Sequence, residues 1–224
     1  MDRLLLTDEL LLLAYDDAGT NRLGRPHLDH GLAGAVLLEL ALAGRVEVVD
    51  GRLAVTDPAP TNVPLLDRAL ATVAGDRPRK PKDWIARLGK GLPDRVLDGL
   101  VDAGVLRRES DRVLWVFPRT RYPSPTGAEP AVETAARERM AAALAGGGPV
   151  DARTAALLGL TRAVGLDRKL FRELPRDRVK ARLAEIAAGD WASAATRKAI
   201  EETQAAVLVA TTAATAAIAT TTVS

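Results

Sequence analysis

The sequence has 224 residues, of which 47% are hydrophobic and 27% charged, a composition typical of folded globular proteins and not of disordered ones. It contains no cysteine, which excludes disulfides, thiolate nucleophiles and cysteine-ligated zinc. The net charge is +2, and 25 of the 31 basic residues are arginines, which reflects either GC-rich codon use or partners that carry phosphate or carboxylate groups.

The first third of the chain predicts two helices and a hairpin. Thr7 is expected as an N-cap, with acidic residues in the first turn of a helix that is apolar on every face. A second helix is expected over about 28–43, and Gly44 ends it. Asp50-Gly51 lies between two apolar runs, 46–49 and 52–55, and therefore predicts a two-residue hairpin.

The remaining two thirds are predicted to be helical apart from one further strand pair. The last segment, 203–224, has no charged residue but consists mainly of Ala and Thr. We therefore expect it to form a packed helix, the alternative being a weak membrane anchor. The other predicted helices lie at about 65–73, 83–88, 94–103, 131–144, 152–164, 168–188 and from 192 onward, and the predicted strands at 105–107 and 113–117.

An ungapped internal repeat relates two parts of the chain at an offset of 60 residues. Each copy has the pattern of a helix, a glycine stop and a strand pair, the order of a winged-helix-like unit. The predicted fold class is mainly α, with a single helical-bundle domain over 1–224 and one or two β-hairpins packed in helix–hairpin units. The matched pairs include Val36/Val96, Leu37/Leu97, Leu40/Leu100, Ala43/Ala103 and Gly44/Gly104.

The sequence has no pattern that equips it for catalysis. It lacks a nucleophile elbow, a P-loop and a His-Glu-x-x-His motif. His27 and His30 could start a metal site, but no third ligand lies nearby, so a helix-capping segment is the better interpretation. We predict no catalytic residue, no metal and no cofactor.

Basic residues alternate with aromatic ones in the middle of the chain. Seven cations lie between Arg77 and Arg95 around Trp84, and five arginines accompany Trp115 and Phe117 in the second strand pair. This pattern suits nucleic acid or an anionic membrane surface, while the plain alternative is a solvated face. The helix at 94–103 carries three Asp against one Arg, which disfavours insertion into a DNA groove.

A family resemblance favours the membrane. The sequence resembles the Golgi phosphoprotein 3 family, and most closely its short bacterial (actinobacterial-type) members, which lack the basic N-terminal tail of the eukaryotic ones. The resemblance implies a peripheral, non-enzymatic protein on the cytoplasmic side of the inner membrane that binds phosphatidylinositol 4-phosphate or another anionic headgroup. The segments that carry it are 4–13 (LLLTDELLLL), 31–46 (GLAGAVLLELALAGRV), 64–67 (PLLD), 84–85 (WI), 95–101, 104–106 (GVL) and 153–158 (RTAALL).

The resemblance also implies where a headgroup would lie. The family's Trp before the second helix, its Arg in a Gly-Leu-Arg-Gly segment and its two later cations correspond to Gly24, Ala33, Lys90 and Pro93, of which only Lys90 is charged. We therefore expect neighbouring cations to rebuild the site, and Trp115 and Phe117 to insert in the membrane or self-associate, core packing being the alternative for Trp115. The candidate headgroup residues are Arg25, Lys90, Arg87, Arg22 and Arg95.

A protein of the same fold that has lost lipid binding is the second hypothesis, and a winged-helix-like nucleic-acid binder is the third.

Overall fold

The computed structural model describes residues 4–113 and 117–221, which are mostly helical, as predicted. Each of the two sheets in these ranges is a two-stranded antiparallel hairpin, β1–β2 and β3–β4. The helices are α1 (Leu6–Ala14), α2 (Arg25–Leu42), α3 (Pro64–Ala74), α4 (Pro81–Leu88), α5 (Leu92–Asp102), α6 (Ala131–Ala145), α7 (Ala152–Ala163), α8 (Asp167–Leu170), α9 (Arg176–Ala188) and α10 (Ala194–Thr221), and the strands are β1 (Val46–Val49), β2 (Arg52–Val55), β3 (Glu109–Val113) and β4 (Phe117–Arg121).

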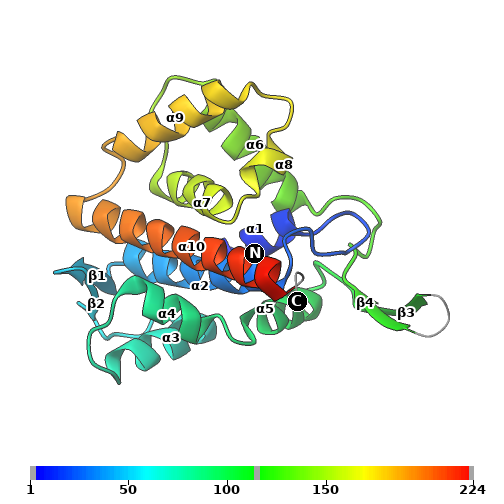
Figure 1. Ribbon diagram of the computed structural model, residues 1–224, viewed down its shortest axis with the longest axis horizontal. Helices are drawn as coiled ribbons and strands as arrows, with labels where there is room; N and C mark the ends of the chain where they lie inside the picture. The colour runs from blue at the N-terminus through cyan, green and yellow to red at the C-terminus, as the bar shows by residue number, and fades with distance from the viewer. Residues whose placement is uncertain (1–3, 114–116, 222–224) are drawn as a thin grey trace.

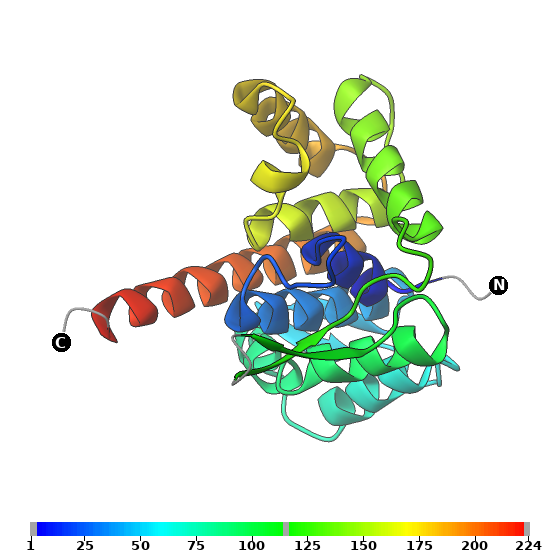
Figure 2. The ribbon, with the colours of Figure 1, turned by 90° about the vertical axis from the view of Figure 1, so that its right-hand side faces the viewer.

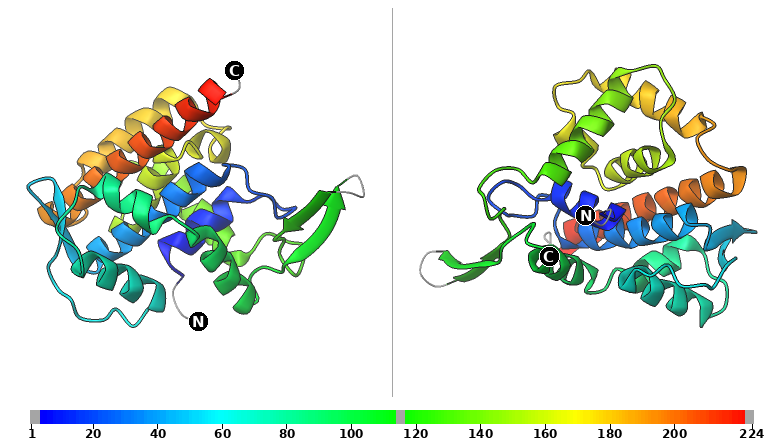
Figure 3. Two further views of the ribbon diagram at one scale, coloured as in Figure 1. Left: turned by 60° about the horizontal axis from the view of Figure 1, so that its bottom comes forward. Right: turned by 180° about the vertical axis from the view of Figure 1, so that it is seen from behind.

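Helix α2 is the centre of the molecule (Figure 1). It lies beside α10, with α6–α9 on one side of this pair and α3–α5 on the other (Figures 1 and 3). Its side chains are buried almost without interruption from Gly31 to Ala41, as expected for a helix that is enclosed on all sides. Gly34 allows the close approach of α10, since a Cβ atom there would lie 2.5 Å from Val207 Cγ2.

Helix α10 packs along α2 and confirms the expected C-terminal helix. Thr203, Val207 and Thr211 are buried, and the hydroxyl of Thr211 donates to the carbonyl of Ala163 in α7 at 3.1 Å. The end of α10 projects beyond the helical body (Figure 2). Among the helices in the described residues, none combines the length and the apolar character that a membrane crossing requires.

The internal repeat at an offset of 60 residues corresponds to a structural similarity where the two helices end. Gly44 and Gly104 both adopt left-handed conformations, with φ of 68° and 70°. The residues that follow make equivalent bonds, Arg45 N–H to the carbonyl of Leu40 at 2.8 Å and Val105 N–H to the carbonyl of Leu100 at 2.9 Å. The two copies of the repeat therefore form the same type of helix C-terminal cap, at Gly44 and at Gly104.

The two hairpins differ beyond these caps. The first forms as predicted, with Val48 opposite Leu53, and buries both residues. In the second, the expected strands at 105–107 and 113–117 are displaced, because Leu106 is buried in the core and pairing begins only at Glu109, opposite Arg121. That hairpin extends away from the body (Figures 1 and 3), unlike a wing folded against its helix.

Two further local predictions are wrong. Helix α1 begins at Leu6, so Thr7 lies inside it, and the carboxylate of Asp8 caps the helix by accepting the Leu5 N–H at 2.9 Å. The helix expected over 168–188 is two helices, α8 and α9, because Pro175 disfavours helical geometry at Leu174 and starts a new helix.

Candidate functional site

The start of α2 and the turn between α4 and α5 form one surface. Gly89 at the end of α4 packs so closely on the second turn of α2 that a Cβ atom there would lie 2.9 Å from the carbonyl oxygen of Asp29. The chain then turns through Gly91, with φ of 67°, into α5. The N-termini of α2 and α5 are thereby brought together. The cations Arg25, Lys90 and Arg95 lie at or next to these two N-termini.

Arg25 is the central residue of this surface and links the two helices. Its guanidinium donates two hydrogen bonds to Asp94 on α5, both 2.9 Å long, and lies 3.7 Å from Asp29 on its own helix. The fork geometry is the strong, bidentate form of this contact. It raises the pKa of Arg25 and lowers the pKa of Asp94, in both cases chiefly through the hydrogen bonds between them.

Asp94 is therefore a component of the site that the pattern of basic residues in the sequence did not indicate. Its side chain is 59% exposed, so an incoming anion can reach the pair from solvent. In the sequence, Asp94 is an acidic residue in the first turn of a predicted helix. The helix dipole alone explains an acid at that position, so the sequence does not indicate a partner for it. Only the fold brings this acid to Arg25, across 69 residues of sequence.

Lys90 lies in the α4–α5 turn and Arg95 in the first turn of α5, and neither has a carboxylate partner among the described residues. Both side chains are exposed, and the guanidinium of Arg95 reaches back to the carbonyl of Lys90 at 3.4 Å. With Arg25 they place three cations around two helix N-termini, a setting that favours anions.

The other two candidates differ in their contacts, and within the described part of the chain only Arg87 is engaged elsewhere through its side chain. Arg22 lies in the loop before α2, and its carbonyl accepts a 2.6 Å bond from Lys169. Arg87 is bound to Asp76 at 2.5 Å in the α3–α4 loop and stacks on the Trp84 ring, 5.4 Å from its centre. Arg87 is thus part of a local ion cluster, and both Arg87 and Arg22 are exposed to solvent.

Three positions that correspond to the family's headgroup ligands have structural roles in this protein. Ala33 has no exposed surface, and Pro93 is buried in the first turn of α5. Gly24 has φ of 79°, a conformation that is strained for tryptophan.

Asp29 is half-buried, and burial raises its pKa, whereas burial lowers the pKa of the adjacent His30.

The second hairpin carries the remaining candidates. Trp115 lies outside the described residues, and Phe117 begins β4 with its backbone opposite Val113. At its base the Tyr122 ring packs edge-on against Tyr15, with 6.3 Å between ring centres. The role of Trp115 and Phe117 in insertion or self-association stays a prediction.

No group suited to a metal ion occurs among the described residues. His27 and His30 do not face a common ligand set, and His27 instead pairs with the hydroxyl of Thr215 on α10 at 3.1 Å. This contact ties the first turn of α2 to the last part of α10.

Two comparisons with known proteins bear on this surface. The sequence profile of Golgi phosphoprotein 3 (GPP34) matches residues 6–203. The vacuolar protein sorting-associated protein 74 of Eremothecium gossypii is 31% identical over 131 residues, a match that covers 47% of this chain and 40% of that protein. Since the profile spans the fold from α1 to the first part of α10, the chain belongs to the Golgi phosphoprotein 3 (GPP34) family.

Proposed function

We propose that the protein is a peripheral membrane protein that binds anionic phospholipid headgroups, of the phosphoinositide type, at the surface formed by Arg25, Lys90 and Arg95. The observation that carries this proposal is the convergence of these cations on the N-termini of α2 and α5. The family's association with phosphoinositides supports it. The protein would act by binding and not by catalysis, on the cytoplasmic face of the inner membrane.

A phosphate would replace the Asp94 carboxylate in the Arg25 fork. The bidentate geometry that now holds Asp94 is the one that a phosphate group uses. Lys90 and Arg95 would then contribute further charge, each worth about 1 kcal/mol near anionic headgroups, or roughly fivefold in affinity. In this proposal Asp94 occupies the site until a headgroup displaces it.

The first test is retention on vesicles of phosphatidylcholine alone, with phosphatidylinositol 4-phosphate, and with phosphatidylserine at equal total charge. We expect retention to rise with phosphatidylinositol 4-phosphate and to fall with added salt, since exposed charges are screened. The double variant Lys90→Gln, Arg95→Gln should lower the apparent affinity by about 25-fold, because each lost cation lowers it roughly fivefold. Equal retention on neutral and anionic vesicles would refute the proposal.

The second test removes the competing carboxylate. Asp94→Asn should increase the affinity for phosphatidylinositol 4-phosphate vesicles by about fivefold or more, because it frees the Arg25 fork and removes one negative charge. Asp98→Asn is the matched control, since Asp98 lies one turn later on α5 and also pairs with an arginine, Arg108. An equal gain in both variants would show that general charge, and not the Arg25 fork, governs binding.

An interaction protein without lipid binding is the second candidate, and one observation favours it. Arg25 is already neutralised by Asp94 and Asp29, while Ala33 and Pro93 have no charge to replace it. Self-association through the β3–β4 hairpin would then be the main activity, and a change of oligomeric state on deletion of 109–121 would measure it. The nucleic-acid hypothesis gains nothing, since Asp94, Asp98 and Asp102 are all exposed along α5.

A further inference from the structure

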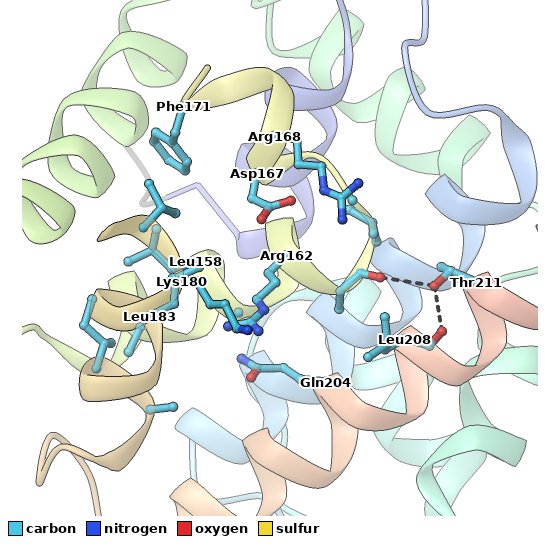
Figure 4. A pocket seen from close by; sticks show the side chains of 18 of the residues that line it. Leu158, Arg162, Asp167, Arg168, Phe171, Lys180, Leu183, Gln204, Leu208 and Thr211 are labelled. Atoms are coloured by element: carbon cyan, nitrogen blue, oxygen red, sulfur yellow. Dashed lines mark hydrogen bonds between the residues drawn. The ribbon is translucent and has the colours of Figure 1, made fainter. Parts of the chain in front are cut away.

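A large cavity lies on the other side of the molecule, away from the α4–α5 turn. It has a volume of about 1010 Å³ and lies among α7, α8, α9 and α10. Figure 4 shows its walls. Known small-molecule pockets have volumes of roughly 300–1,000 Å³, so this cavity has room for a sizeable ligand. His27, in the first turn of α2, also lines the cavity, whereas Arg25, Lys90 and Arg95 do not.

Two cations meet in this cavity. Arg162 on α7 and Lys180 on α9 point toward one another, and the amide of Gln204 on α10 lies with them (Figure 4). In the described part of the chain neither cation has an ion-pair partner. Like charges brought together repel, and an anion between them would receive hydrogen bonds from both helices.

The remaining charges at the cavity are more dispersed. Three acids and three further arginines also line it, and one of these arginines, Arg172, is paired with Glu173 at 3.0 Å. The basic side chains outnumber the acidic ones by five to three, and the excess favours an anionic ligand. The acids are Asp167, Asp177 and Glu201, and the other two arginines are Arg168 and Arg176.

Much of the remaining lining is apolar, apart from His27 and three threonines of α10. Leu158 and Leu183 are buried at the cavity wall, and the half-buried rings of Phe171 and Trp191 extend it. Leu208 also lines the cavity with 49% of its surface exposed, although large apolar side chains are rarely left so exposed in the described residues. An aliphatic chain would cover this surface, at a gain of roughly 25 cal/mol per Å² removed from water.

We propose that this cavity binds a single-chain anionic amphiphile, a molecule with a carboxylate or phosphate head and one long aliphatic chain. Arg162 and Lys180 hold the head, with Gln204 as a further donor. The chain lies against Leu158, Leu183 and Leu208. This site is separate from the headgroup surface and does not depend on it.

The test is calorimetric titration of the full chain with four probes below their micellar concentrations where these apply: oleate, oleoyl lysophosphatidate, uncharged monoolein and inorganic phosphate. We expect one molecule of oleate or lysophosphatidate to bind per chain, and the tighter of the two identifies the head. Monoolein and inorganic phosphate should each bind at least tenfold more weakly, since each lacks half of the recognised chemistry. Equal binding of monoolein, or of phosphate, would overturn the assignment.

Three variants locate the site. Arg162→Gln with Lys180→Gln should weaken oleate binding at least tenfold. Arg178→Gln with Lys198→Gln makes the same change of charge on α9 and α10, outside the cavity, and should leave binding within twofold. Ala187→Trp, which adds bulk at an exposed position of the cavity lining, should also weaken binding while thermal unfolding confirms the fold. Equal effects of the two charge variants would overturn the proposal.

Discussion

Replacement of Arg153 by methionine is expected to lower the free energy of unfolding by about 3–5 kcal/mol, the cost of breaking a buried ion pair from one side. Arg153 is 8% exposed and lies between two buried carboxylates. One of its nitrogens is 2.7 Å from Glu39 Oε1, and another is 3.3 Å from Glu9 Oε2 and also donates to the carbonyl of Leu4. Methionine would fill the space but leave Glu9 and Glu39 without this charge.

The same cluster anchors the start of α1. Glu39 on α2 accepts the Leu6 N–H at 2.6 Å, which satisfies a backbone donor at the beginning of a helix. Glu9 retains one other partner, Arg139 on α6, at 3.2 Å. Through these contacts α1, α2, α6 and α7 are joined, so the loss of Arg153 should affect the whole bundle.

Denaturant titration measures this change, and two controls define its cause. Adding Glu39→Gln to Arg153→Met should recover part of the lost stability, because the amide removes a buried charge and still accepts the Leu6 N–H. Arg172→Met removes an exposed pair, with side chains 79% and 85% accessible, and should change stability by less than about 0.5 kcal/mol. A loss at Arg153 no larger than that at Arg172 would contradict the buried-pair argument.

Replacement of Gly19 by alanine is expected to lower the free energy of unfolding by roughly 2–5 kcal/mol, from left-handed strain and overpacking together. Gly19 has φ of 74°, and a Cβ atom there would lie 2.3 Å from Pro123 N. Its carbonyl accepts the Tyr122 N–H at 2.9 Å. In the alanine variant, the loop before α2 must therefore move away from the base of the β3–β4 hairpin.

Gly127→Ala is the matched control for this effect. Gly127 has almost the same φ, 73°, but a Cβ atom there would have nothing within 4 Å. It should therefore show only the left-handed strain, about 1–2 kcal/mol. Hydrogen exchange at the amides of Tyr122 and Arg107 should accelerate in the Gly19 variant alone, and equal exchange in both variants would show that the contact does not hold the hairpin.

The local elements followed closely from local sequence. The first hairpin has the predicted boundaries because Asp50-Gly51 forms its turn and the residues of β1 alternate in burial. The caps at Gly44 and Gly104 are equally local, since each depends on a glycine after a periodic apolar helix. The resemblance to the Golgi phosphoprotein 3 family, visible in short ordered segments, is confirmed by a profile match over residues 6–203.

Predictions were less accurate where a distant contact competes with local preference. Apolar residues at 105–107 predicted a strand, but Leu106 is buried in the core and Arg107 donates to the carbonyl of Pro123. The same limit applies to Arg25. Its charge was visible in the sequence, whereas its pairing with Asp94 depends on how α5 packs beside α2.

The sequence by itself determined the mainly helical class, the absence of cysteine chemistry and the family, because composition, periodicity and short motifs are properties of neighbouring residues. The extent of a single domain over 1–224 and the roles of Lys90 and the second hairpin stay predictions. Only the tertiary structure decided which charges meet: Arg25 with Asp94, Arg153 with Glu39, and Arg162 with Lys180 across the cavity. Such encounters depend on helix packing, since in each case the two residues come from different helices.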